Sequence, residues 1–91
     1  MLYVVSYDIP DDKRRTRVHT ALKNYGTRVQ YSVFECELEP ARLAELHSRL
    51  AELIEPHEDH LRYYRLCKDC LAQTLTQGDR PLTSVPDYWI V

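Results

Sequence analysis

The chain has 91 residues, a length that is enough for one small domain. Its net charge is −2, from 12 lysines and arginines against 14 acids. No apolar run approaches the roughly 20 residues of a transmembrane helix, and three cysteines exclude a complete internal disulfide framework. No signal-peptide pattern precedes the first strand, so we expect a cytoplasmic protein with reduced thiols and no membrane association.

The first predicted elements are a strand and a helix. Residues 2–9 predict a central strand, because Val and Tyr are frequent and apolar residues occupy both alternating sets. Asp11 or Asp12 is then expected to cap a helix that runs to about residue 24. Gly26 is expected to end that helix in a left-handed conformation. The buried stripe of the helix comes from residues at helical spacing: Val18, Ala21, Leu22 and Tyr25.

A hairpin, a second helix and a further strand follow. Residues 28–38 predict two strands with a tight turn near Tyr31 and Ser32, followed by a helix whose first turn holds Pro40. Residues 59–67 predict the last strand of the series. The second hairpin strand alternates, with Phe34, Cys36 and Leu38 on one face and Val33, Glu35 and Glu37 on the other. The stripe of the second helix is Leu43, Leu46, Leu50 and Leu53.

This order of elements predicts an α+β fold of the ferredoxin-like βαββαβ type, an antiparallel sheet with both helices on one face. We expect one domain over residues 1–91. The end of the chain is too apolar for a free tail, so we predict an extra C-terminal strand over about residues 84–91. In so small a domain its pairing edge is expected to belong to a second copy of the chain, with a dimer interface at Tyr88, Trp89, Ile90 and Val91.

Asp8 is the first candidate functional residue, because it places a carboxylate at the end of the most apolar strand. It shares a face with Val4 and Ser6, opposite the tyrosines, so it would point to the open side of the sheet. One interpretation is that Asp8 caps the turn into the first helix. The other is that it binds a metal ion, for which one carboxylate is too few. Glu35 and Glu37 are candidate helpers, although solubilising charges are the commoner role, and a two-fold dimer would instead bring two copies of Asp8 together.

A cluster of cations is the second candidate. Residues 1–34 carry six cations and three acids, whereas residues 35–60 carry two cations and eight acids, so the basic charge is local. The helix dipole disfavours cations in the first turns, which makes phosphate binding attractive; a solvated start paired with Asp11 and Asp12 is the alternative. The candidate nucleic-acid-binding residues are Lys13, Arg14, Arg15, Arg17 and Arg28.

A Cys-x-x-Cys motif, here Cys67-Lys-Asp-Cys70, can bind zinc or carry out thiol redox chemistry, but the surrounding sequence favours neither role. Zinc needs about four ligands, and His57 and His60 have no diagnostic spacing. A redox motif normally follows the first strand of a βαβ unit, whereas this one follows the last. We therefore expect structural thiols.

Two stretches, VVSYDI over residues 4–9 and RVQYSVFEC over residues 28–36, together resemble a known family. It is the small universal CRISPR-associated protein, second in that naming series, and the resemblance extends over essentially the whole chain. It implies a homodimer of ferredoxin-like subunits in which each C-terminal strand pairs with the partner's sheet. It also implies that Asp8 is the metal ligand and catalytic residue, with magnesium or manganese as cofactor. The basic positions of the family correspond to Arg15, Arg17 and Arg28.

The resemblance implies two functions. One is a metal-dependent endonuclease on single-stranded RNA or double-stranded DNA. The other is the central dimer of the spacer-integration complex, which bridges two dimers of a CRISPR-associated integrase. A non-catalytic scaffold that holds nucleic acid for the integrase is the alternative to an enzyme. A ferredoxin-like domain that binds a small ligand or regulates another protein is a third possibility.

Overall fold

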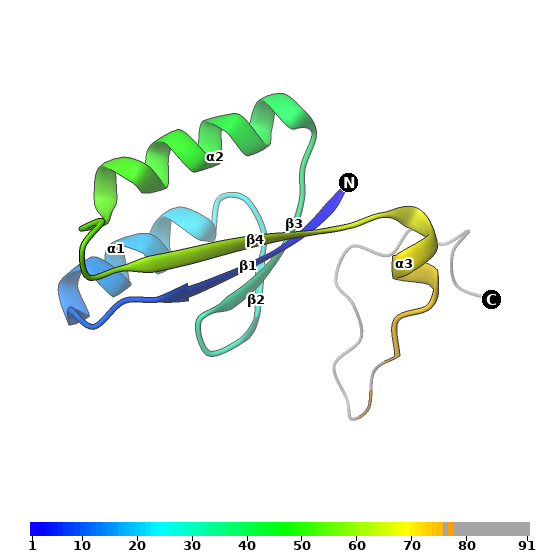
Figure 1. The fold of residues 1–91 in the computed structure, drawn as a ribbon, viewed down its shortest axis with the longest axis horizontal. Helices are drawn as coiled ribbons and strands as arrows, with labels where there is room; N and C mark the ends of the chain where they lie inside the picture. The colour runs from blue at the N-terminus through cyan, green and yellow to red at the C-terminus, as the bar shows by residue number, and fades with distance from the viewer. Residues whose placement is uncertain (76, 78–91) are drawn as a thin grey trace.

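The computed structural model describes residues 1–75 and 77. Its elements are β1 (Leu2–Asp8), α1 (Asp12–Leu22), β2 (Thr27–Gln30), β3 (Val33–Glu37), α2 (Pro40–Leu53), β4 (His60–Leu66) and α3 (Lys68–Ala72). The four strands form one antiparallel sheet in the order β2-β3-β1-β4, and α1 and α2 lie on the same side of it (Figure 1). The ferredoxin-like prediction is confirmed, whereas the strand predicted for residues 84–91 lies outside the described residues. None of the helices in the described part of the chain has the length and apolar character needed to cross a membrane.

The central strand β1 divides its residues between the two faces of the sheet as the period-two pattern predicts. Tyr3, Val5 and Tyr7 are buried in the core with residues of both helices and of β3. Val4 and Ser6 are half-buried on the opposite, open face, and Asp8 is exposed at the end of the strand. The helix layer therefore fixes which way Asp8 points.

Both long helices begin as predicted. The Asp11 carboxylate caps α1 by accepting a hydrogen bond from the Arg14 backbone N–H at 2.9 Å, and this bond lowers the pKa of Asp11. Pro40 occupies the first turn of α2, where its missing N–H costs no hydrogen bond. Val18 and Leu22 of α1 and Leu46 and Leu50 of α2 are fully buried, which confirms the two apolar stripes.

The predicted role of Gly26 is wrong. Helix α1 ends at Leu22, and Gly26 does not have a left-handed conformation; within the part of the chain that the structure describes, Ser32 does, with φ 62°, in the turn between β2 and β3. Gly26 is required for space instead. A Cβ added there would lie 2.2 Å from the Glu35 carbonyl oxygen and 2.5 Å from the Cys36 sulfur.

The short helix α3 is not predicted by the sequence pattern, and it explains part of the Cys-x-x-Cys motif. The Cys67 sulfur accepts a hydrogen bond from the Cys70 backbone N–H at 3.3 Å and thereby caps the helix. Cys67 thus has the structural role that we expected of it. No group of three or more His, Cys, Asp or Glu side chains gathers as a metal site within residues 1–75 and 77.

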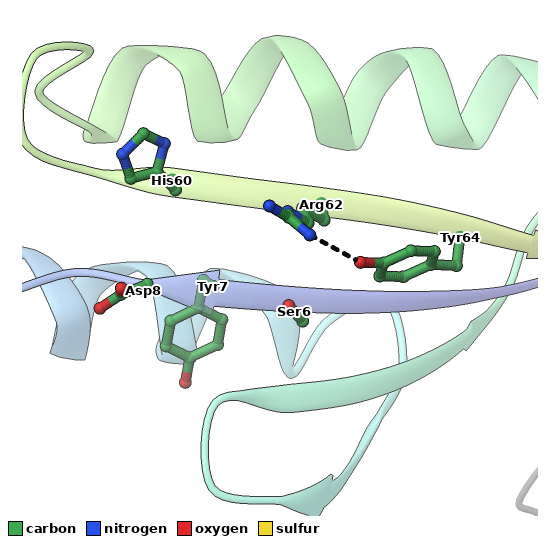
Figure 2. A pocket seen from close by; sticks show the side chains of 6 residues that line it. All are labelled: Ser6, Tyr7, Asp8, His60, Arg62 and Tyr64. Atoms are coloured by element: carbon green, nitrogen blue, oxygen red, sulfur yellow. Dashed lines mark hydrogen bonds between the residues drawn. The ribbon is translucent and has the colours of Figure 1, made fainter.

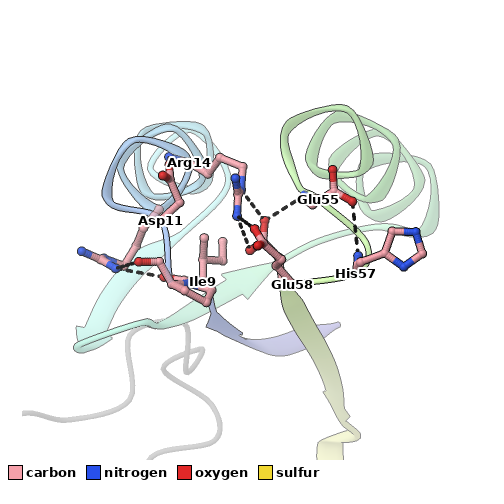
Figure 3. A network of polar contacts seen from close by, with 9 residues as sticks. Ile9, Asp11, Arg14, Glu55, His57 and Glu58 are labelled. Carbon is pink, nitrogen blue, oxygen red and sulfur yellow. Dashed lines mark hydrogen bonds and ion pairs between the residues drawn. The ribbon is translucent and has the colours of Figure 1, made fainter.

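Arg14 links α1 to the loop before β4 (Figure 3). Its Nε donates to Asp59 at 2.8 Å, and its Nη2 donates to Asp59 at 3.1 Å and to Glu58 at 2.7 Å. The Asp59 side chain is fully buried and also accepts from the Glu55 backbone N–H at 2.8 Å. The Arg14 guanidinium holds the pKa of Asp59 below its usual range. Asp59 is therefore a loop anchor rather than the start of β4, which begins at His60.

Replacing Asp59 with asparagine should reduce the free energy of unfolding by about 1–3 kcal/mol, because it removes a buried charge-assisted bond. The folded-state pKa of Asp59 is depressed, so its contribution is present above the ordinary aspartate value of about 4 and is lost as pH falls through the lower folded-state pKa. Urea unfolding at neutral and acid pH measures both effects. Glu58→Gln, which removes the exposed partner of the same arginine, should change stability by less than about 0.5 kcal/mol. Equal losses in the two variants would contradict the anchor role.

Gly26→Ala should also destabilise the fold, by about 1–3 kcal/mol, because the backbone of β3 must move away from the new methyl group. Thermal unfolding of this variant can be compared with that of Asn24→Ala, an exposed position in the same turn. A Gly26→Ala protein as stable as Asn24→Ala would show that the close approach to Glu35 relaxes freely.

Candidate functional site

The candidate site lies on the open face of the sheet, where the C-terminal end of β1 pairs with the start of β4. The register places three residues of β1 directly opposite three of β4: Asp8 opposite His60, Ser6 opposite Arg62, and Val4 opposite Tyr64. A hollow follows this row and is lined by Ser6, Tyr7, Asp8, His60, Arg62 and Tyr64 (Figure 2). We refer to these six residues as the open-face hollow.

Asp8 is exposed at one end of the open-face hollow. Its carboxylate makes no hydrogen bond or ion pair with any other residue of the described part of the chain. The interpretation that Asp8 caps the first helix is wrong, because Asp11 does so. An exposed carboxylate without a protein partner, on a rigid central strand, is free to bind a cation from solution.

The two glutamates predicted as helpers do not join Asp8 within one chain. The β1–β3 register places Glu35 opposite Val4 and Glu37 opposite Leu2, well back along β1. At about 3.3 Å per residue, they lie roughly 13 and 20 Å from the level of Asp8. Glu37 pairs with the N-terminal amine at 2.7 Å, and Glu35 is buried rather than solvated. Of these three carboxylates, Asp8 is therefore the one that lies at this end of the sheet.

The cations of α1 divide into two kinds. Arg14 is held by Asp59 and Glu58, so it already has a structural role. Arg15 pairs with Asp12 and donates from Nη1 to the Ile9 carbonyl oxygen at 2.9 Å, just beyond Asp8. The predicted pairing with Asp11 or Asp12 thus holds for Arg15, whereas the partners of Arg14 are acids far away in the sequence. The side chains of Lys13 and Arg17 are exposed, and neither makes an ion pair with a residue in the described ranges.

A second hollow brings Arg15 and Arg28 together between α1 and the turn that joins β2 to β3. Tyr31 is 72% exposed beside them, so an aromatic ring adjoins two guanidinium groups. The Tyr7 hydroxyl lies 3.5 Å from His19 Nδ1, and burial lowers the pKa of His19, which favours the neutral ring. The lining is Tyr7, Arg15, Thr16, His19, Arg28, Tyr31 and Ser32. Because Tyr7 lines both hollows, the two adjoin across β1.

Among the lining residues that the sequence did not predict as part of a site, the ones with side chains suited to binding nucleic acid are His60, Arg62, Tyr64 and Tyr31. The signal for the first three was present, because a ferredoxin-like fold pairs the first and last strands of the series, and alternation places even-numbered residues of both on one face. Applied to β4, that rule brings Arg62 and His60 beside Asp8. For Tyr31 the signal was its place in a tight turn, where a large side chain stays exposed.

Comparison with known proteins supports the family resemblance seen in the sequence. The family model for CRISPR associated protein Cas2 matches residues 1–74. The "CRISPR-associated endoribonuclease Cas2 3" of Synechocystis is 48% identical over 90 residues, which cover 99% of this chain and 98% of that protein. The crystal structure of Streptococcus pyogenes Cas2 at pH 6.5 has a TM-score of 0.75 and 35% identity, over 86% of this chain and 100% of that one.

A chain of a partial Cas6-RT-Cas1–Cas2 complex has a TM-score of 0.79 and 30% identity, and the match covers 93% of each chain. The region matched by the family model, residues 1–74, contains β1 with Asp8, the cations of α1, and all of β4. The chain belongs to the Cas2 family of CRISPR-associated proteins.

Proposed function

We propose that this chain is the subunit of a homodimeric, magnesium- or manganese-dependent endonuclease that hydrolyses phosphodiester bonds of single-stranded RNA or double-stranded DNA. The observation that carries the proposal is the exposed Asp8 carboxylate at the end of β1, which has no partner among the described residues. The related protein of Synechocystis is named an endoribonuclease, which supports the same chemistry.

The donor chemistry of Asp8 fits magnesium, but one chain offers too few ligands. Carboxylate oxygens are the ligands that magnesium prefers, with further positions filled by water and substrate phosphate. The described part of the chain holds no group of three ligating side chains. Two copies of Asp8 related by a two-fold axis would supply the second carboxylate, and a two-fold arrangement is the commonest for small homo-oligomers. A divalent ion held there would supply activation of water and neutralisation of charge on the phosphate.

The other residues would bind and orient the nucleic acid. Arg15, Arg17 and Arg28, with Lys13, offer positive charge on the α1 side of the sheet, and the exposed Tyr31 ring offers a surface on which an unpaired base can stack. Arg14 is the weakest of the predicted nucleic-acid contacts, because a phosphate would have to compete with Asp59 and Glu58.

The second candidate function is a scaffold that holds nucleic acid without cutting it and bridges dimers of a CRISPR-associated integrase. The single carboxylate per chain at the site favours this function, as does the similarity to a chain of a complex that contains Cas1. Both functions need the same dimer and the same cations. They differ in whether Asp8 is required for a chemical step.

Asp8→Asn decides between the two. If the proposal is correct, this change should reduce metal-dependent cleavage at least about 100-fold, because it removes the charge that binds the ion but keeps the shape of the side chain. Cleavage of labelled single-stranded RNA and duplex DNA, with and without a chelator, provides the measurement. Glu52→Gln, an exposed carboxylate on α2, is the matched control and should cleave at the wild-type rate. Wild-type cleavage by Asp8→Asn would leave the scaffold function.

The cations predict a salt-dependent affinity. Replacing Arg15, Arg17 and Arg28 with alanine should reduce the slope of log affinity against log salt by up to about three units for duplex DNA, and by about two for a single strand. Arg49→Ala removes an exposed cation from α2 and should leave the slope within half a unit of wild type. Binding is measured by fluorescence anisotropy in chelator, which keeps the nucleic acid intact. An unchanged slope in the triple variant would assign these arginines to the protein surface alone.

A further inference from the structure

Two opposite charges on the open face are kept apart. Arg62 and Asp8 are diagonal neighbours on adjacent strands, so their backbones lie roughly 7–8 Å apart on the same face of the sheet. Both side chains are exposed. An arginine so close to a carboxylate can reach it and form a two-pronged ion pair. No such pair joins these two residues.

Arg62 instead forms a hydrogen bond with a tyrosine of its own strand. Arg62 Nη1 donates to the Tyr64 hydroxyl oxygen at 3.3 Å, and Tyr64 is 49% exposed two residues further along β4. Figure 2 shows Arg62 joined to Tyr64 by this bond, with Asp8 at the opposite end of the row. The bond uses one of the five N–H groups of the guanidinium, so most of its donors stay available. Arg14, Arg15 and Arg42, by contrast, each contact a carboxylate.

The row therefore offers two opposite kinds of binding group side by side. Asp8 presents a carboxylate for a cation, Arg62 presents a guanidinium for an anion, and Ser6 is paired with Arg62 across the two strands. A phosphodiester accompanied by a divalent cation carries both complementary charges in one ligand. The planar guanidinium also matches two phosphate oxygens at once, which a lysine cannot do.

We propose that Arg62 binds the phosphate of the nucleic acid that is held at Asp8, and that Tyr64 is a positioning residue that keeps Arg62 from pairing with Asp8. This inference rests on the proposed function, because it assigns Arg62 to the same site. It adds to the cations of α1 and β2 a phosphate contact from a different strand, on the opposite face of the sheet.

The chain offers a matched control. Arg65 is also an exposed arginine of β4, but it lies opposite Tyr3, whose side chain faces the helices, so Arg65 is on the other face from Asp8. Arg62→Ala and Arg65→Ala thus remove the same charge from the same strand. Any effect of net charge alone is equal in the two variants.

The test measures binding of fluorescein-labelled single-stranded RNA, and of duplex DNA of the same sequence, in chelator. Arg62→Ala should weaken binding of at least one probe about tenfold or more, Arg62→Lys should recover part of the loss, and Arg65→Ala should stay within about twofold of wild type. With magnesium, Arg62→Ala should raise KM more than it lowers kcat. Tyr64→Phe should weaken binding about two- to fivefold alone and add nothing in the Arg62→Ala background, because the two act together.

Equal affinities of Arg62→Ala and Arg65→Ala for both probes would overturn the proposal. So would a loss of affinity that coincides with a change in the oligomer mass by light scattering, since Arg62 would then support assembly. If Arg62→Ala does not fold, Arg62→Gln takes its place in every comparison. A wild-type protein that binds but does not cleave would refute the nuclease function, and the binding comparison would still decide the role of Arg62.

Discussion

The burial of Tyr3, Val5 and Tyr7 beneath the two helices is the constraint on which the rest of the structure depends. Because the side-chain period of a strand is two, this burial places Val4, Ser6 and Asp8 on the open face. A slip of one residue would expose three apolar side chains and turn Asp8 into the core, where an unpaired carboxylate is costly. The packing of the core and the orientation of Asp8, the candidate metal ligand, are therefore fixed together. The register of β4 is set by its pairing with β1.

The basic start of α1 serves that arrangement as well as any nucleic acid. Arg14 ties the helix to buried Asp59 at the entrance to β4, and Arg15 donates to the carbonyl oxygen of Ile9, the residue after Asp8. Both strands are thus anchored to the first turn of one helix next to the Asp8–His60 pair. In the sequence this cluster is an excess of local positive charge, but two of its arginines hold the site in place. Lys13, Arg17 and Arg28 are therefore more available to a ligand than Arg14 and Arg15 are.

What could be predicted from the sequence was whatever local periodicity encodes. The alternation of β1 and β3, the stripes of α1 and α2, the cap at Asp11 and the place of Pro40 in the first turn of α2 are all encoded locally, and the structure confirms them. What could not be predicted depends on residues far apart in the chain. Gly26 is needed because β3 passes close by, and Arg14 finds its partner 45 residues away. Arg62 and Asp8 become neighbours on one face only through the pairing of β1 with β4. The helix α3 is five residues long, too short for a periodic signal.

In the proposed dimer, the open face of each chain would supply half of a site, and its charges give a physical reason why the second chain and a cation would bind together. Two copies of Asp8 brought across a two-fold axis would repel each other unless one takes up a proton or a cation lies between them. Two copies of Arg62, held back by Tyr64, would remain unable to neutralise those carboxylates directly. Dimerisation and ion binding would then stabilise each other, since the ion removes the repulsion and the second chain supplies the missing ligand. A phosphodiester entering such a site would meet a cation and two arginines together, which neither chain alone can offer.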